Sequence, residues 1–201
     1  MELKVSPLKN LNSKIVIFAA LLLSMSATLA QTTAIQHTVD ADGHPMALWE
    51  KSVAQPKGHI FLHHGRTWSS IPDFDLQVSG EDLSLIDGFN GMGYSVWPLD
   101  ASGYGETPRD SSGWNTPDRA AQDLSIVLDW LRGRNGEVTH AWGWSYGSMV
   151  AQLAAQRYPE AMLSVTLFGY PTDPDAEIPQ SNSQTAPRLA RLLELQPLMI
   201  S

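Results

Sequence analysis

The chain has 201 residues, of which 43% are apolar, and a formal net charge of -8 at pH 7. This length suits a single domain. Its few, scattered basic residues exclude a nucleic-acid surface and a docking site for anionic lipid, because both need clustered positive charge. Nothing in the composition implies a cofactor or a bound metal, and we expect neither.

The first 30 residues have the pattern of an export signal. Lys4, Lys9 and Lys14 give a positive start, Ile15 to Leu23 form an apolar segment, and Thr28-Leu29-Ala30 is a small-x-small cleavage site. The apolar segment is too short to span a bilayer comfortably, so we expect removal, with an uncleaved membrane anchor as the alternative. Because the chain has no cysteine, it needs no disulfides after export, which predicts a periplasmic or secreted bacterial protein.

The next segments predict a hairpin and then a short apolar strand. Residues 34–39 and 46–53 alternate in polarity around Asp42-Gly43, the turn pair of a two-residue hairpin. The strand beginning at His59 ends in His63-His64-Gly65-Arg66. A loop at the carboxyl end of such a strand can offer a backbone N–H to an oxyanion, and Arg66 is the donor by position. For the two histidine rings we favour hydrogen bonds to local backbone over a catalytic role.

A helix and a further strand follow. The spacing of apolar residues predicts a helix over 82–92 with Leu83 facing inward, and a strand over 94–99. Asp100 then opens a tight, glycine-rich loop that runs to Gly105. We interpret Asp100 as a residue that braces this turn, since aspartate at a strand end commonly does so.

The second helix begins with clear capping residues. Thr116-Pro117-Asp118 combines an N-cap, a proline in the first turn and an acidic residue favoured by the helix dipole. We expect Gly133 to close this helix and Asp123 to lie on its solvated side. An apolar strand over 138–142 comes next.

That strand leads into Gly143-Trp144-Ser145-Tyr146-Gly147, a G-x-S-x-G sequence. Apolar residues at helical spacing follow it, and Pro159 stops the helix. A strand-to-helix elbow leaves a serine Oγ exposed and aims the next backbone N–H at a developing oxyanion. We therefore interpret Ser145 as a nucleophile, the alternative being a serine in an ordinary glycine-flanked turn.

One more apolar strand, Met162 to Phe168, completes the pattern. The alternation of strands and helices predicts an α/β fold with a doubly wound, mostly parallel sheet. From Pro171 the chain becomes a proline-rich loop, then polar, then a short amphipathic helix over 188–195. We therefore divide the chain into a signal peptide (1–30), a core (31–171) and a loop with a short helix that begins a cap (172–201).

Three motifs at successive strand ends resemble those of the α/β-hydrolase family. They are His63-His64-Gly65, Asp100-x-x-Gly103-Tyr104-Gly105 and Gly143-x-Ser145-x-Gly147, and the resemblance covers about residues 34–170. It implies Ser145 as nucleophile, the backbone amides of Tyr146 and Arg66 as the oxyanion hole, and hydrolysis of carboxylic esters. Peptidases, acyltransferases and cofactor-free peroxidases of the family share the elbow, whereas its dehalogenases and epoxide hydrolases use an aspartate nucleophile, which Ser145 argues against.

The sequence departs from the family in its triad, whose order is serine, acid, histidine. No histidine follows Ser145, since the six stand at positions 37, 44, 59, 63, 64 and 140. Asp173 or Asp175 is the candidate acid. We therefore expect an α/β-hydrolase fold truncated after the strand that follows the elbow, and an exported serine hydrolase that is weakly active or inactive alone.

Two other interpretations stay open. In the first, His64 or His63 acts as the base from a neighbouring strand end. In the second, a degenerate hydrolase fold serves as a non-catalytic binding module, with Trp68, Trp97, Trp114 and Trp144 lining an apolar pocket, although packing in the core and loops is the simpler role for these tryptophans.

The partners follow from these interpretations. We expect a small-molecule ester as substrate, no nucleic acid and no stable membrane anchor. If the sheet ends at Met162 to Phe168, that strand leaves an edge uncovered, which predicts self-association.

Overall fold

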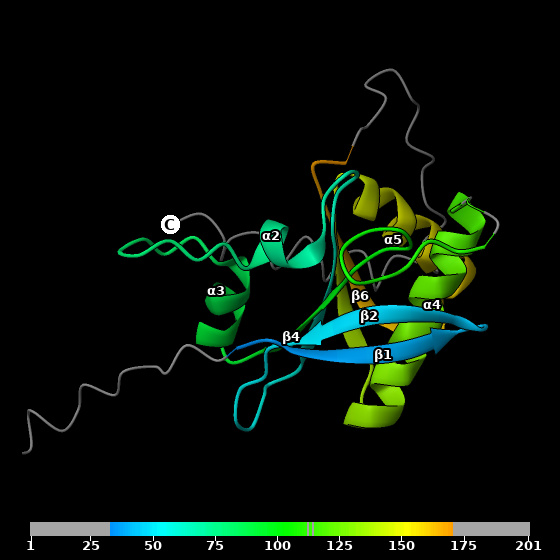
Figure 1. Cartoon of the computed structure of the whole chain (residues 1–201). Coiled ribbons are helices and arrows are strands. Elements are labelled where there is room, and N and C mark those ends of the chain that lie inside the picture. Colours follow the sequence, from blue (N-terminus) through cyan, green and yellow to red (C-terminus); the bar gives the residue numbers. More distant parts are fainter. Residues whose placement is uncertain (1–32, 112, 114, 171–201) are drawn as a thin grey trace, which may run out of the picture. The chain divides into compact units, whose positions relative to one another are not determined.

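The computed structural model describes residues 33–111, 113 and 115–170 (Figure 1). The expected signal peptide, the candidate acids Asp173 and Asp175, and the expected helix over 188–195 lie outside these residues. Within the described part of the chain, no helix combines the length and the hydropathy needed to cross a membrane.

A six-stranded sheet organises the described residues. Its strand order is β1-β2-β4-β3-β5-β6. The pairs β4–β3, β3–β5 and β5–β6 are parallel, while β1–β2 and β2–β4 are antiparallel. The expected α/β fold with a mostly parallel sheet is confirmed. The strands are β1 (Ile35–Ala41), β2 (His44–Glu50), β3 (His59–His63), β4 (Ser95–Leu99), β5 (Thr139–Trp144) and β6 (Met162–Phe168).

The hairpin of β1 and β2 turns at Asp42-Gly43, as expected. Both residues have positive φ, 52° and 83°, which a two-residue hairpin turn requires. The Asp40 carboxylate accepts a hydrogen bond from the Gly43 N–H at 2.6 Å and holds the turn. Ala41 and His44 are therefore directly paired across the two strands.

Helices cover both faces of the sheet, with α2 and α3 on one side and α4 and α5 on the other (Figure 1). Alternation along β3 explains this, because Phe61 packs with α4 and α5 while Ile60 and Leu62 pack with Phe74 of α2 and Ile86 of α3. The helices are α2 (Ser70–Phe74), α3 (Leu85–Gly91), α4 (Pro117–Asn135), α5 (Tyr146–Arg157) and the 3-10 turn η1 (Pro159–Ala161).

The start of α3 differs from the expectation. The Ser84 side chain accepts a hydrogen bond from the Asp87 N–H, so it caps a helix that begins at Leu85 rather than at residue 82. Leu83 lies before this cap and its side chain is 48% exposed. The prediction that Leu83 faces inward is wrong because the residue is outside the helix.

Helix α4 begins as expected but ends later. The Thr116 side chain caps it by accepting from the Arg119 N–H at 3.2 Å. Gly133 lies inside the helix, which ends at Gly136 in a left-handed conformation (φ 79°). The expectation that Gly133 closes the helix is therefore wrong, because the left-handed glycine after the last turn is Gly136.

Asp123 of α4 is buried, with 2% of its surface exposed, so its expected place on the solvated side is wrong. The Arg119 Nε donates to its carboxylate at 2.7 Å, and Arg119 also donates to the Ala41 carbonyl of the hairpin. Burial raises the pKa of Asp123, and the bond to Arg119 opposes that rise. The hairpin packs over this side of α4, which periodicity within the helix cannot show.

Candidate active site

Ser145 alone connects β5 to α5. Its φ is 52° and its ψ is -113°, a conformation that residues with a Cβ rarely adopt. The Ser145 N–H donates to the Phe168 carbonyl of β6 at 2.8 Å, which fixes the turn against the neighbouring strand. Strained backbone of this kind gathers at functional sites, and it is the conformation expected of a nucleophile elbow.

The two glycines of the motif are required by close backbone contacts. A Cβ at Gly143 would lie 2.4 Å from the Gly147 carbonyl oxygen, and one at Gly147 would lie 2.2 Å from the His63 carbonyl oxygen. Neither distance is possible for a real Cβ. The elbow is therefore pressed directly against the end of β3, where the His63-His64-Gly65 motif begins.

Ser148 supports the elbow from the first turn of α5. Its fully buried hydroxyl lies 2.7 Å from the Gly143 carbonyl oxygen and 2.9 Å from the Phe168 carbonyl oxygen, and it accepts from the Phe168 N–H at 3.1 Å. This support was not among the features expected from the sequence. Its only sequence signal is a small hydroxyl side chain directly after the motif, which is too common to be specific.

The loop after β3 carries Arg66 and is held from two sides. The Gly65 N–H donates to the Asp73 carboxylate of α2 at 3.3 Å. A Cβ at Gly65 would lie 3.0 Å from the Trp144 ring, so the loop packs closely on the residue before Ser145. Burial raises the pKa of Asp73 to about 6, and the Gly65 hydrogen bond partly offsets that rise.

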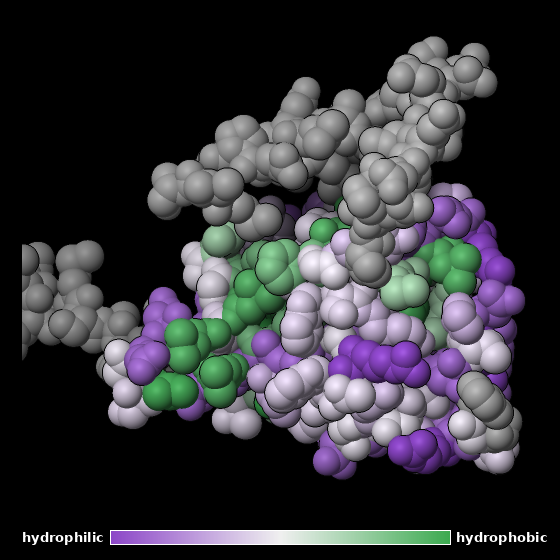
Figure 2. All heavy atoms as spheres, turned by 90° about the horizontal axis from the view of Figure 1, so that it is seen from above, coloured by the Kyte–Doolittle hydropathy of each residue, from purple (hydrophilic) through white to green (hydrophobic). Residues whose placement is uncertain are grey.

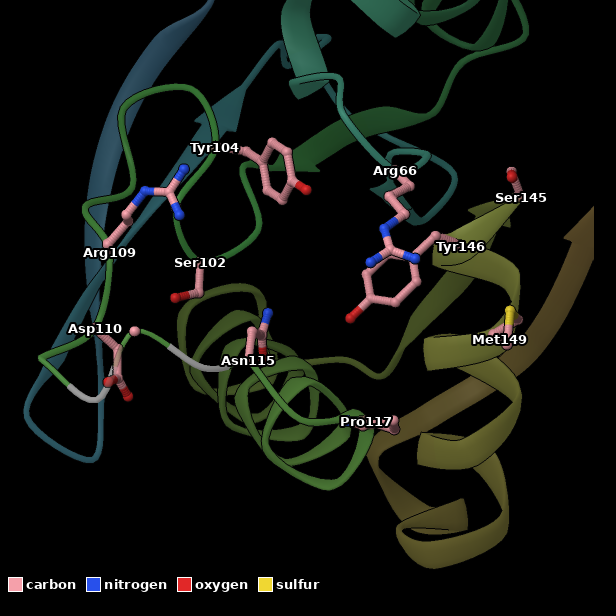
Figure 3. A pocket seen from close by; sticks show the side chains of 12 residues that line it. Arg66, Ser102, Tyr104, Arg109, Asp110, Asn115, Pro117, Ser145, Tyr146 and Met149 are labelled. Atoms are coloured by element: carbon pink, nitrogen blue, oxygen red, sulfur yellow. The ribbon is translucent and has the colours of Figure 1, made fainter.

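A pocket of about 620 Å³ brings the three expected site residues together (Figure 3). Ser145, Tyr146 and Met149 line it from the start of α5, and Arg66 lines it from the loop after β3. The segment between β4 and α4 supplies most of the remaining wall, including Ser102, Tyr104 and Arg109. Figure 3 shows Ser102, Tyr104 and Arg109 on the side of the pocket opposite Ser145 and Met149.

The tryptophans proposed as a pocket lining do not line this pocket. Trp97 is 1% exposed and belongs to the core, Trp68 is 54% exposed, and Trp144 packs on Gly65. None of the three is among the residues of the pocket wall. These contacts agree with packing in the core and loops, the role favoured for these tryptophans, and Trp114 lies outside the described residues.

Asp100 braces the loop between β4 and α4, as expected. Its buried carboxylate accepts from the Ser70 N–H at 2.8 Å, the Ser70 hydroxyl at 2.7 Å, the Trp49 indole N–H at 3.0 Å and the Glu106 N–H at 3.0 Å. A Cβ at Gly105 would lie 2.2 Å from one of its oxygens. The glycine lets the loop close around the carboxylate and shapes the pocket wall.

The rings of His63 and His64 bond local backbone, as expected. His64 Nδ1–H donates to the Gly65 carbonyl at 2.7 Å, and His64 Nε2 accepts from the Ala101 N–H at 2.9 Å. His63 Nδ1–H donates to the His64 carbonyl at 3.1 Å. Burial lowers the pKa of His63 to about 3, so its ring is neutral. Because both nitrogens of His64 are engaged, its ring has no lone pair left for a catalytic proton.

The other histidines have structural contacts. His59 accepts from the Trp97 indole N–H at 3.0 Å, His140 bonds the Ser164 hydroxyl at 2.7 Å, and His37 bonds Glu50 at 2.6 Å. His44 contacts the pocket wall through the Ser102 hydroxyl at 3.3 Å. Within the described ranges, no group of three or more His, Asp or Glu side chains is placed to hold a metal ion.

This geometry agrees with a comparison against known protein families. The family described as alpha/beta hydrolase fold matches residues 58–198. The chain belongs to this family. The turn at Ser145, the loop that carries Arg66 and the braced β4–α4 loop are therefore parts of an alpha/beta hydrolase fold. No curated protein sequence matches the chain.

Solved structures share the alpha/beta hydrolase fold at low identity. A CIB-like hydrolase from Thermoplasma acidophilum is 17% identical with a TM-score of 0.55, covering 69% of this chain and 63% of that one. An epoxide hydrolase from Vigna radiata is 20% identical with a TM-score of 0.57, covering 80% and 44%. The thioesterase domain of the curacin biosynthetic pathway is 15% identical with a TM-score of 0.56, covering 85% and 53%. The chain thus spans less than two thirds of the length of these structures.

Proposed function

We propose that this alpha/beta hydrolase is a serine hydrolase of carboxylic esters with Ser145 as nucleophile. The observation that carries the proposal is the strained conformation of Ser145 at the wall of a pocket that Arg66 and Tyr146 also line. A serine held on such an elbow has its Oγ free to attack, and nearby backbone amides can stabilise the resulting charge.

The proposed reaction follows the family chemistry. Ser145 Oγ attacks the ester carbonyl carbon, and its proton passes to a base. The carbonyl oxygen becomes an oxyanion that accepts hydrogen bonds from the Tyr146 and Arg66 N–H groups. Tyr146 is the first residue of α5, so its N–H has no intrahelical acceptor. The ester C–O bond then breaks, the alcohol leaves with the proton, and water releases the acid from Ser145.

We propose that the described residues include no base suited to this step. No histidine follows Ser145, and the rings of His63 and His64 bond backbone groups. An enzyme without its triad histidine keeps only the rate that the oxyanion hole and substrate binding supply. We propose that this chain alone hydrolyses esters weakly, and that Asp173 or Asp175 is the acid of the triad.

A fluorophosphonate probe tests the nucleophile, because its reaction needs an activated serine. We expect slow labelling of the full chain, mapped to Ser145 by peptide mass, and slow turnover of p-nitrophenyl acetate. Ser145→Ala removes the label, whereas Ser102→Ala, the other serine of the pocket wall, keeps it.

Three results would count against parts of this proposal. A label on Ser102 would refute Ser145 as nucleophile. Fast turnover that depends on Ser145 would show that a base is present. No labelling at all would favour the non-catalytic binding module.

We also propose that the protein is exported, on the basis of the charged, apolar and small-residue pattern of residues 1–30. Export to the periplasm or the medium predicts a mature chain that begins at Gln31. N-terminal sequencing of the protein from a bacterial host measures this, and a chain that keeps Met1 or residues 2–30 would contradict it.

A further inference from the structure

The arginines of the described residues fall into two groups. Four form ion pairs with carboxylates: Arg119 with Asp123, Arg132 with Asp129, Arg134 with Glu50 and Arg157 with Asp118. The other two, Arg66 and Arg109, form no ion pair with any described residue, and both line the pocket. The described arginines that form no ion pair with a described carboxylate thus both lie at the pocket, in a chain whose net charge is -8.

The Arg109 side chain is positioned by the loop that carries it. The Gly103 N–H donates to the Pro108 carbonyl at 3.1 Å and closes this loop beside Arg109. Gly103 has a φ of 81°, and a Cβ there would lie 3.1 Å from the Cγ of Arg109. The aliphatic stem of Arg109 therefore rests on glycine backbone while its guanidinium lies at the pocket (Figure 3).

One carboxylate, Asp110, also lines the pocket, but it does not cancel this charge. The charge of Asp110 also acts on Arg119 and Asp123 of α4. Two arginines and one aspartate thus line the pocket, so these side chains give its wall a net positive charge. Arg66 also lies close enough to Tyr146 for its charge to lower the pKa of the Tyr146 hydroxyl, against the larger rise that burial causes.

A guanidinium keeps its charge at all ordinary pH values and offers five N–H donors in a plane. This arrangement suits the paired oxygens of a carboxylate or a phosphate. The pocket has Ser145 and Met149 on one side and Arg109 on the other (Figure 3). A ligand that places its ester at Ser145 can therefore extend its far end towards Arg109.

We infer that the pocket takes esters that carry an anionic group, a carboxylate or a phosphate, and that Arg109 selects them by binding this group. The inference rests on the proposed function, because it assumes that the ester lies at Ser145. Arg66, between the two ends, adds positive charge along the path of the ligand.

Binding to the full chain carrying Ser145→Ala tests the inference without turnover. The probes are monomethyl glutarate, which has a free carboxylate, and methyl glutaramate, its neutral amide of nearly the same shape. Isothermal titration calorimetry at low salt should show that the anionic probe binds about tenfold more tightly, the size of one charge-assisted hydrogen bond. Added salt should reduce this preference because it screens the guanidinium. Monomethyl phosphate, added as a competitor, shows whether a phosphate is bound as well as a carboxylate.

Substitutions test whether Arg109 causes the preference for the anionic probe. Arg109→Met should abolish the preference, Arg109→Lys should keep part of it, and Arg132→Met, which removes an ion-paired arginine of α4, should leave it unchanged. Equal affinity for the two probes, or a preference that survives Arg109→Met, would overturn the inference. If Arg109→Met loses its circular dichroism spectrum, Arg109→Lys and the salt dependence decide.

These binding experiments can fail independently of the proposed function. Loss of the anion preference with Ser145 still labelled by a fluorophosphonate refutes only the substrate class. Retention of the preference with no labelling refutes only the nucleophile.

Discussion

Ser145 adopts a backbone conformation that costs free energy, and the neighbouring residues must compensate for that cost. Its N–H bonds the Phe168 carbonyl, and the Ser148 hydroxyl joins Gly143 of β5 to Phe168 of β6. A φ of 52° at a residue with a Cβ costs on the order of 1–3 kcal/mol. These bonds couple the backbone geometry of Ser145 to the stability of the sheet.

Ser148→Ala tests this coupling. The substitution leaves the part-buried Phe168 N–H and the buried Gly143 carbonyl without the hydroxyl, so the free energy of unfolding should fall by about 1–3 kcal/mol. Urea denaturation measures the change. As a matched control, Ser125→Ala removes another buried hydroxyl, which bonds only the Gln122 carbonyl of its own helix α4, and it should lower stability less than Ser148→Ala does. Equal stabilities for the two variants would show that Ser148 does not brace the elbow.

At the scale of elements, the short helix α2 controls the loop that carries Arg66. Asp73 of α2 accepts the Gly65 N–H, while Asp100 at the end of β4 accepts from Ser70 at the start of the same helix. Two carboxylates from different elements thus hold the segment from residue 65 to 74 against the sheet. The partial burial of Asp73 makes this attachment depend on pH.

The sign of that dependence follows from the pKa of Asp73, which rises from its ordinary 3.8 to about 6 on folding. Between about pH 4 and 6 the folded chain therefore binds more protons at this residue than the unfolded chain does. The contribution of Asp73 to the free energy of unfolding falls as the pH rises through this window. Asp73→Asn, which keeps an acceptor for Gly65, removes the dependence. Chemical denaturation of both proteins at several pH values measures it, and parallel profiles would contradict the prediction.

At the scale of the whole described molecule, β6 is the last strand on its side of the sheet. Leu163 and Phe168 on this strand are 52% and 58% exposed. Figure 2 draws one face of the molecule, on which apolar residues form patches between areas of polar surface. An exposed apolar edge strand offers unpaired backbone groups to another chain. This supports the proposal that the chain self-associates through β6.

Light scattering after size-exclusion chromatography tests the proposal at increasing protein concentration. We expect the apparent mass to rise with concentration, and Leu163→Lys to reduce this rise because a charge disfavours edge pairing. Met92→Lys is the matched control, since Met92 is 54% exposed at the end of α3 and lies off the edge strands. A monodisperse monomer at every concentration, or equal effects of the two lysines, would contradict it.

The sequence predicted the features that depend on local turn chemistry. Three such features each need particular residues within a few positions of one another, so a single sequence is enough to predict them. They are the Asp42-Gly43 turn, the Thr116 cap and the elbow from Gly143 to Gly147. The bracing role of Asp100 was also predictable, because a glycine-rich turn directly follows it.

Features that depend on long-range packing could not be predicted in the same way. Asp123 is buried because the β1–β2 hairpin, some 80 residues earlier, covers its side of α4. Ser148 matters because β6 brings Phe168, 20 residues later, to its hydroxyl. Arg109 looks like any loop arginine in the sequence, and only the fold shows that it lines the pocket without a carboxylate partner.

The strand order carries a consequence for how the chain folds as it is synthesised. β4 and β5 each pair with β3, and β6 pairs with β5, so every strand after β3 finds a partner that has already left the ribosome. The β1–β2 hairpin forms from neighbouring residues but must wait for β4 before it joins the sheet. Growth outward from β3 first brings the elbow against the end of β3, and the later strand β6 then fixes it, because the Phe168 carbonyl accepts the Ser145 N–H.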